Sequence, residues 1–378
     1  MPALIESISK VTNRANRIWD RAVLAVESKL GIRDPLRIMP YKGYGTPETV
    51  CIRGRVLEKE GIRSLGKEAS VVKNLVNMYR RFDSDEVPHA MLKVCVGDCQ
   101  ETVEADSEGF FNAELSVDSS LSTASLWHPV YIELLDPPPR KQEVVMAEGE
   151  VILVAPSAQF GVISDIDDTV VYTAARKPLE MIRIAYLGNA RSRRPFAGVA
   201  PFYQALQRGN TADGSSAGNP IFYVSSSPWN MYDLFDKFVV NNSIPTGPIL
   251  LRDIELSPAN LMSFSHGKHK REQIDPLLSR FPEMPFILFG DSGQKDVEIY
   301  AQLVKDYPGR ILAVYIRDAL PDDEVRHQQI EQISQQICEA RVEFLLFSET
   351  VDAAKHAASR DWIEESAIAD IQTDEGTK

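Results

Sequence analysis

From residue 151 onwards, short apolar segments alternate with amphipathic segments along the chain. The apolar segments include VILVA, FGVIS, PIFYV, PFILF and ILAVYI, and segments such as NMYDLFDKFVV and DVEIYAQLVKDY lie between them. Apolar strands that alternate with amphipathic helices are typical of a parallel sheet covered by helices on both faces. We therefore predict an α/β domain with such a sheet over residues 156–363.

The preceding region, residues 45–155, has a different pattern. Its apolar segments are short and rich in Val, Ile and aromatic residues, as in ETVCIRGRVL, AMLKVCVGDCQETVEA, GFFNAELSV and HPVYIELL. Gly-Asp and Ser-Glu-Gly turn signals separate them. Several short strands joined by turns predict a small β-sandwich domain.

The two ends of the chain differ from both regions. Between residues 4 and 30, apolar side chains recur at steps of three and four, and most of the basic side chains lie off this stripe. This predicts an amphipathic helix, followed by a linker, over residues 1–44. The helix either packs on its own protein or lies against a membrane surface or a partner. Residues 364–378 are acidic and polar, which predicts a flexible tail.

Composition narrows the classes of partner and the cellular location. The formal net charge of −13 argues against binding to nucleic acid, whose phosphates attract basic surfaces. No apolar run reaches the length of a membrane-spanning helix, and the N-terminus lacks the layout of a secretory signal. The four cysteines are scattered and fit reduced thiols. We therefore expect a cytoplasmic protein, with peripheral contact to a membrane left open.

Polar residues gather where three of the predicted strands of the α/β region end. Asp165, Asp167, Asp168 and Thr169 follow FGVIS, three serines from Ser225 follow PIFYV, and Asp291 and Asp296 follow PFILF. Parallel strands bring their carboxyl ends to one edge of the sheet, where ligands bind. Carboxylates crowded there repel one another unless a cation holds them, and oxygen ligands favour Mg²⁺.

These motifs resemble those of a known superfamily. The stretch from Asp165 to Thr169 is similar to the Asp-x-Asp-x-Thr signature of the haloacid dehalogenase superfamily of aspartyl-phosphate phosphatases. A serine after a strand, a lysine and Gly-Asp-x4-Asp follow in the superfamily's order. The longer stretches SDIDDTV, YVSSSPWNMYDLF, HKREQI, FILFGDSGQKDVEIY and ILAVYIRD resemble the catalytic domain of actin-patch-type phosphatidate phosphatases and their bacterial relatives, over roughly residues 160–320.

The resemblance implies a Rossmann-like, haloacid dehalogenase-type fold and a set of catalytic roles. Asp165 resembles the nucleophile that forms the aspartyl-phosphate, and Asp167 the general acid and base. Ser225 would bind a phosphoryl oxygen, and Lys270 would neutralise charge on the nucleophile and the transferred group. The Mg²⁺ ligands that the resemblance implies are Asp165, Asp167, Asp291 and Asp296, the last directly or through water.

Further residues are predicted to contact the substrate, with some alternatives open. These predicted contacts are Thr169, Ser226, Arg191, Arg193 and Arg194. The three arginines either form a solvated basic face or receive an anionic headgroup. Lys268 competes with Lys270 for the lysine role, and Asp168 shapes the turn rather than the chemistry. His266 and His269 form an H-x-x-H pair, which lacks the further ligands of a zinc site.

The motifs and the resemblance together predict a Mg²⁺-dependent phosphatase that hydrolyses a phosphate monoester through an aspartyl-phosphate. The leading substrate is phosphatidate or a related lipid phosphate. The alternatives are a phosphatase of a soluble phosphometabolite, a phosphotransferase, and a non-catalytic interaction protein on a decayed scaffold. The sequence contains neither a nucleotide-binding P-loop nor the G-x-S-x-G motif of serine lipases.

Overall fold

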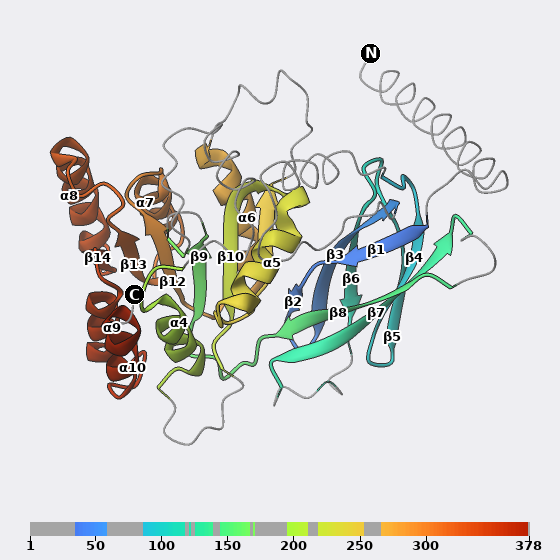
Figure 1. Cartoon of the computed structure of the whole chain (residues 1–378), viewed down its shortest axis with the longest axis horizontal. Coiled ribbons are helices and arrows are strands. Elements are labelled where there is room, and N and C mark those ends of the chain that lie inside the picture. Colours follow the sequence, from blue (N-terminus) through green and yellow to red (C-terminus); the bar gives the residue numbers. More distant parts are fainter. Residues whose placement is uncertain are drawn as a thin grey trace, which may run out of the picture. The chain divides into compact units, whose positions relative to one another are not determined.

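The structure is a computed structural model of the chain, and it describes part of it. The described residues are 35–58, 86–117, 121, 125–138, 144–166, 169–170, 195–210, 218–252 and 266–376. The helix predicted for the N-terminal segment lies outside them. Apart from residues 125–126, the described residues up to Leu153 belong to one compact unit, and those from Val154 to a second. Each unit has its own sheet (Figure 1).

The described residues of the first unit form eight strands. They are β1 (Leu36–Pro40), β2 (Gly43–Gly45), β3 (Thr49–Glu58), β4 (Met91–Val96), β5 (Cys99–Glu104), β6 (Phe110–Ser116), β7 (Trp127–Asp136) and β8 (Met146–Leu153). Seven follow the order β1-β3-β2-β8-β7-β4-β5, and β6 pairs with β3. Among these pairs only β2 and β8 run parallel.

The strands of this unit bury one face. Buried and more exposed residues alternate along β4 and β7, as expected for strands with one face on a core. Val50, Val94, Ile132 and Val151 are among the fully buried side chains of that core. All eight strands are joined by hydrogen bonds into one sheet, so the two packed sheets of a sandwich remain a prediction.

The described residues of the second unit form an α/β domain around a six-stranded parallel sheet. Its strands are β9 (Gly161–Asp165), β10 (Ile221–Pro228), β11 (Ile249–Arg252), β12 (Phe286–Asp291), β13 (Ile311–Arg317) and β14 (Glu343–Phe347). The order is β11-β10-β9-β12-β13-β14, and every neighbouring pair is parallel. The parallel sheet predicted from the apolar segments is therefore confirmed.

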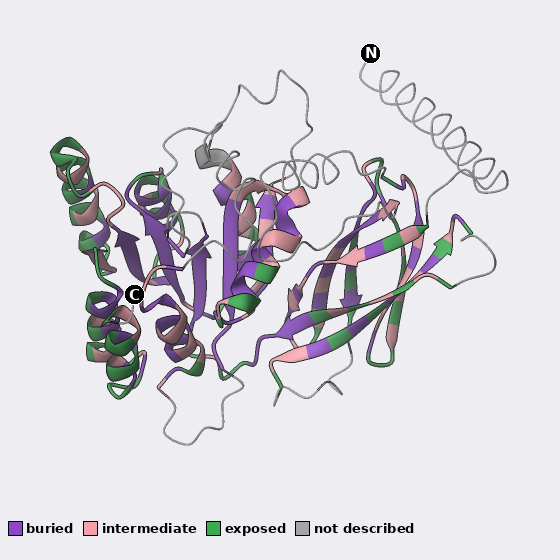
Figure 2. Cartoon of the chain, in the orientation of Figure 1, coloured by how far each residue is buried: buried purple, intermediate pink, exposed green. Residues whose placement is uncertain are grey.

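Helices cover both faces of this sheet. They are α4 (Val199–Arg208), α5 (Tyr232–Asn241), α6 (His266–Arg280), α7 (Asp296–Asp306), α8 (Glu324–Glu339), α9 (Thr350–Ser359) and α10 (Ala367–Gly376), with a short 3₁₀ turn, η2 (Trp229–Met231). Phe289 of β12 packs against Phe202 and Tyr203 of α4. The next residue, Gly290, points to the opposite face, where an added Cβ would lie 2.6 Å from Cβ of Asp296. Accordingly, β9 and β12 are buried throughout (Figure 2).

The C-terminal segment is helical, so the flexible tail predicted from its acidic composition is wrong over residues 367–376. These residues form α10, which packs against α4 and α9 and buries Ile371 completely. Its acidic side chains bind helix N-termini. Asp374 accepts a 2.7 Å hydrogen bond from the N–H of Gly198 before α4, and Glu375 one of 3.1 Å from Val351 in α9. Carboxylates are favourable at these positive helix ends.

Replacing Ile371 with alanine is expected to lower the free energy of unfolding by about 2–5 kcal/mol, because it removes a fully buried side chain and leaves a cavity. Denaturant unfolding of the whole chain measures the effect. Val240→Ala in α5 is the control, since Val240 is 55% exposed and its loss should change stability by no more than about 0.5 kcal/mol. Equal stability of the Ile371→Ala protein and the wild type would contradict the docking of α10.

Two expectations from composition concern cross-links and membrane spans. All four cysteines are described and all are free thiols. In the part of the chain that the structure covers, no helix combines the length and the apolar character needed to cross a membrane. With no disulfide present, the described fold is held together by packing, hydrogen bonds and ion pairs.

Candidate active site

The candidate active site lies at the carboxyl edge of the parallel sheet, on three neighbouring strands. Asp165 is the last residue of β9, and Asp291 is the last residue of β12. On the other side of β9, Val224 of β10 is in register with Asp165, which places Ser225 one residue beyond it. The topology therefore brings the three predicted polar clusters to one edge, as the parallel sheet requires.

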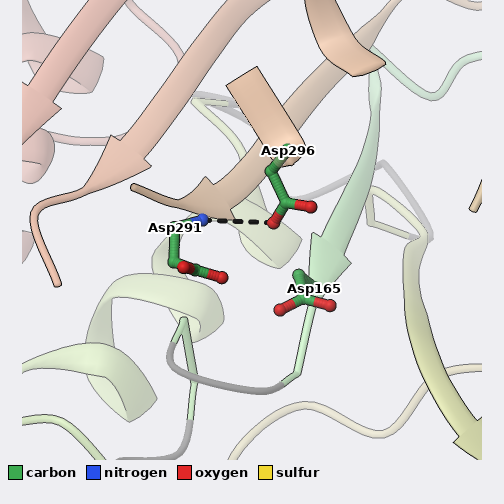
Figure 3. Close-up of side chains that lie close together, drawn as sticks. All are labelled: Asp165, Asp291 and Asp296. Carbon is green, nitrogen blue, oxygen red and sulfur yellow. Dashed lines mark hydrogen bonds between the residues drawn. The ribbon is translucent and has the colours of Figure 1, made fainter. Parts of the chain in front are cut away.

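Three aspartates converge there. The carboxylates of Asp165, Asp291 and Asp296, the first residue of α7, offer oxygens that all lie within 4.8 Å of one another. Each residue is at most 1% exposed. Figure 3 shows Asp165 and Asp291 reaching from different strands toward the same space, with Asp296 beside them. Three buried carboxylates this close repel one another strongly unless positive charge compensates them.

Lys270 of α6 provides part of that compensation. Its side chain is 1% exposed, and its Nζ lies 2.9 Å from Oδ1 of Asp165 and donates a hydrogen bond to Oδ1 of Asp296. Burial alone would lower the pKa of Lys270, but the negative charges of Asp165, Asp296 and Asp291 outweigh it and raise the pKa above its usual value. The ammonium therefore stays charged at neutral pH. Because α6 begins at His266, Lys270 lies within the helix rather than before it.

Backbone amides fix the carboxylate of Asp291. Its Oδ1 accepts hydrogen bonds from the N–H groups of Gly293 (2.7 Å) and Gln294 (2.9 Å). The N–H of Asp291 in turn donates to Oδ2 of Asp296, at 3.2 Å (Figure 3). Gly290 makes this approach possible, because a Cβ at this position would lie 2.6 Å from Oδ2 of Asp296. The turn after β12 therefore holds both aspartates before any ligand binds.

The donor set fits a divalent cation. Three buried carboxylates and one ammonium leave two negative charges at the edge of the sheet. Carboxylate oxygens are the ligands that Mg²⁺ prefers in proteins. Both oxygens of Asp296 already accept hydrogen bonds, from Lys270 and from the N–H of Asp291. Asp165 and Asp291 are therefore the stronger candidates for direct ligands, and Asp296 for the residue that orients Lys270.

The hydroxyl groups predicted to contact substrate lie at the same edge. Oγ of Ser225, a fully buried residue, accepts a 3.0 Å hydrogen bond from the N–H of Ser227. Thr169 is 2% exposed, and its carbonyl accepts a hydrogen bond from Nε of Arg317 at 3.3 Å. Among the described residues, Oγ1 of Thr169 and Oγ of Ser226 are buried without a hydrogen-bond partner. Both hydroxyls can therefore donate to a ligand oxygen.

Several residues that the sequence analysis discusses lie outside the described part of the chain. They are Asp167, Asp168, Arg191, Arg193 and Arg194. The side chains of His266 and Lys268 are also outside the description. Nδ1 of His269 lies 3.1 Å from a carboxylate oxygen of Glu272 in the same helix. The contacts of Lys270 with two aspartates support its choice over Lys268.

Two further residues support the site, and the sequence analysis assigned no role to them. Arg317, 4% exposed, follows the apolar segment ILAVYI at the end of β13. Its guanidinium lies over the rings of Phe196 (4.1 Å) and Phe347 (4.8 Å) while it binds the Thr169 carbonyl. A charged residue directly after a buried strand is the signal that identified Asp165, so the same reasoning identifies Arg317. Gln273 of α6 donates to the carbonyl of Ser225 at 3.3 Å, which only the packing of α6 reveals.

Two fungal proteins are similar to part of this chain. Phosphatidate phosphatase APP1 of Saccharomyces cerevisiae is 34% identical over 158 residues, which cover 42% of this chain and 25% of the yeast protein. An uncharacterized protein of Schizosaccharomyces pombe is 29% identical over 166 residues, which cover 43% of this chain and 25% of that protein. The similarity thus spans a quarter of the length of each relative.

Among solved structures, a carbohydrate acetylesterase from Xanthomonas citri was compared with this chain. The alignment covers 80% of this chain and 66% of the acetylesterase. The sequence identity is 11% and the TM-score is 0.30. This TM-score is too low to indicate a shared fold.

A family model also matches part of the chain. Residues 160–318 match the family described as "Phosphatidate phosphatase APP1, catalytic domain". The matched region contains Asp165, Ser225, Lys270, Asp291 and Asp296, which the structure places at one edge of the sheet. The resemblance predicted from the motifs is therefore confirmed: this part of the chain is similar to the catalytic domain of the APP1 phosphatidate phosphatases.

Proposed function

We propose that the chain is a Mg²⁺-dependent phosphoric monoester hydrolase of the haloacid dehalogenase type, acting through an aspartyl-phosphate on Asp165. The observation that carries the proposal is the buried group of Asp165, Asp291, Asp296 and Lys270 at the carboxyl edge of a parallel sheet. These residues all lie within the region similar to a phosphatase catalytic domain.

In the proposed reaction, a carboxylate oxygen of Asp165 attacks phosphorus, and the bond from phosphorus to the substrate alcohol breaks. Lys270 keeps Asp165 ionised and stabilises the transferred group by its charge, while Ser225 and Thr169 donate hydrogen bonds to phosphoryl oxygens. When bound, Mg²⁺ offsets the negative charge shared by the carboxylates and the phosphoryl group. Asp165 and Asp291 are its proposed ligands, together with the backbone carbonyl of Asp167 that the resemblance implies.

Asp167 is proposed as the general acid and base on the strength of the resemblance. It would give a proton to the leaving alkoxide and then take one from the water that attacks the aspartyl-phosphate. That second attack releases inorganic phosphate and restores the carboxylate of Asp165.

Phosphatidate is the proposed substrate because the yeast relative is named a phosphatidate phosphatase. A lipid substrate implies peripheral contact with a bilayer, where the predicted arginines Arg191, Arg193 and Arg194 would meet anionic headgroups. A soluble phosphate ester is the alternative substrate. The complete set of Asp165, Lys270 and Asp291 argues against a decayed, non-catalytic scaffold.

A phosphate-release screen tests the proposal. The purified full chain is expected to release phosphate from phosphatidate in mixed micelles and vesicles when Mg²⁺ is present, and to lose that activity with a chelator. Glycerol 3-phosphate and a chromogenic aryl phosphate serve as soluble comparisons. Higher catalytic efficiency on a soluble ester would replace the lipid with a soluble substrate. No phosphate release from any of the esters, with Mg²⁺ present, would contradict the phosphatase.

A further inference from the structure

Arg326, in the first turn of α8, holds the turn that follows β12. Its Nε donates to the carbonyl of Ser292 and its Nη2 to the carbonyl of Gln294, each at 2.8 Å. The N–H groups of Gly293 and Gln294 in this turn are the ones that bind Oδ1 of Asp291. One guanidinium therefore bridges two carbonyls of the turn whose amides hold the candidate metal ligand.

Arg326 is itself held in place. Its Nη1 and Nη2 donate to the two carboxylate oxygens of Glu298 in α7, at 2.6 and 3.1 Å. Hydrogen bonding to Glu298 raises the pKa of Arg326 despite its partial burial, so the guanidinium is always charged. The side chain is 12% exposed. A paired arginine loses little conformational freedom when it binds further acceptors, which suits it to hold a turn rigidly.

Neighbouring residues support the same turn. Oγ of Ser292 donates to Oδ1 of Asp318 (3.2 Å) and accepts from the N–H of Ala319 (2.9 Å). Nε2 of His327, the residue after Arg326, lies 3.0 Å from the other oxygen of Asp318. The first turn of α8 thus reaches the turn after β12 at two points, directly through Arg326 and indirectly through His327 and Asp318.

We propose that Arg326 is a positioning residue for the cation site, which fixes the turn over residues 292–294 so that Asp291 stays directed toward Asp165. Its hydrogen bonds to the turn go to the carbonyls of Ser292 and Gln294, so it would act on Asp291 through the turn. Arg326 lies outside residues 160–318, so the similarity to the phosphatase family does not include it. The inference rests on the proposed function in one respect, namely that the bound cation is Mg²⁺.

Arg326 could affect Mg²⁺ binding by its charge or by positioning Asp291, and the two explanations predict opposite changes in Mg²⁺ affinity when Arg326 is replaced. The positive guanidinium interacts with Asp291 and Asp296, so it also repels a cation bound by them. If its charge were all that mattered, Arg326→Met would strengthen Mg²⁺ binding. If Arg326 positions Asp291, the same change weakens binding, and loss of a supporting partner of a metal ligand typically costs about 10–100-fold in affinity.

The test measures binding of Mg²⁺ alone to the full chain by titration calorimetry. Arg326→Met is expected to weaken the affinity by about 10-fold or more. Arg326→Lys keeps the charge but loses the planar, two-branched donor group, so it should also weaken binding, and it carries the test if the Met variant does not fold. In phosphate-release assays, the Mg²⁺ concentration for half-maximal rate should rise by the same factor, with kcat recovering at saturating Mg²⁺.

Arg310→Met is the matched control. Its guanidinium also binds backbone carbonyls, those of Leu278 (3.1 Å) and Met284 (3.0 Å), before the start of β12 and away from Asp291. This variant should lose stability without a change in Mg²⁺ affinity. Equal losses of Mg²⁺ affinity in Arg310→Met and Arg326→Met would overturn the proposal.

Unchanged or tighter Mg²⁺ binding by a folded Arg326→Met or Arg326→Lys protein would also overturn the proposal, and it would leave the proposed function intact. A wild-type protein that binds no Mg²⁺ would overturn both the positioning role and the Mg²⁺-dependent function. If the wild type releases no phosphate from any ester but Arg326→Met still weakens Mg²⁺ binding, the result supports the positioning role of Arg326 and contradicts the proposed phosphatase activity.

Discussion

Replacing Asp165 with asparagine is expected to reduce phosphate release by about 10⁴-fold or more at saturating substrate and Mg²⁺. The amide has nearly the shape of the carboxylate but cannot form an acyl-phosphate, so the first covalent step is lost. Uncatalysed hydrolysis of phosphate monoesters is slow enough that enzymes accelerate it by up to ~10²¹-fold, so little background reaction would hide the loss. Single-turnover phosphate release by the variant measures the effect.

The variant should keep its fold, which separates chemistry from stability. The Asp165→Asn change removes one of three crowded carboxylates while Lys270 keeps its partner Asp296, so the thermal melt should stay near that of the wild type. Asp306→Asn is the control: Asp306 ends α7 and pairs with Arg271 at the surface, away from the sheet edge. Phosphate release at a wild-type rate by the Asp165→Asn protein would show that another group is the nucleophile.

The sequence predicts the α/β part of the fold well because local and long-range preferences agree there. The segments that become β9, β10, β12 and β13 are largely apolar up to the polar residues at their carboxyl ends, which suits strands buried on both faces. The C-terminal segment shows the limit of such reasoning. Its acidic composition suggested exposure, but Ile371 packs into the domain and Asp374 binds a helix N-terminus. These contacts can be seen only once the structure shows α4 and α9 packed against the C-terminal helix.

The residues of the candidate site also fall into two groups, those that the sequence predicts and those that only the structure shows. Asp165, Asp291 and Asp296 are predictable because motif order and parallel topology place them at one edge. The role of Arg326 is not predictable in this way, because it depends on which loop the first turn of α8 meets, a contact 32–34 residues away in sequence. Its sequence position, in a polar helix, looks like that of any solvated arginine. Supporting residues of this kind require the packed structure.

Replacing Lys270 with methionine is expected to lower the free energy of unfolding by about 3–5 kcal/mol, since it leaves buried carboxylates without their cationic partner. Methionine has a similar length, so the loss reflects charge rather than a cavity. Denaturant unfolding without divalent cations measures it. Lys237→Met is the control, because Lys237 is 58% exposed and pairs with Asp233 within one helix, a contact that contributes about 0.5 kcal/mol or less.

The dependence of the stability loss on pH and on Mg²⁺ identifies why the Lys270→Met protein is less stable. Lowering the pH neutralises crowded carboxylates, which removes the repulsion that the missing ammonium no longer offsets. The stability deficit should therefore shrink as the pH is lowered from neutral. Mg²⁺ should also stabilise the variant more than the wild type, because Asp165, Asp291 and Asp296 then share three negative charges instead of a net two. A deficit that changes with neither pH nor Mg²⁺ would mean that Lys270 stabilises the domain by packing, and that the carboxylates do not depend on its charge.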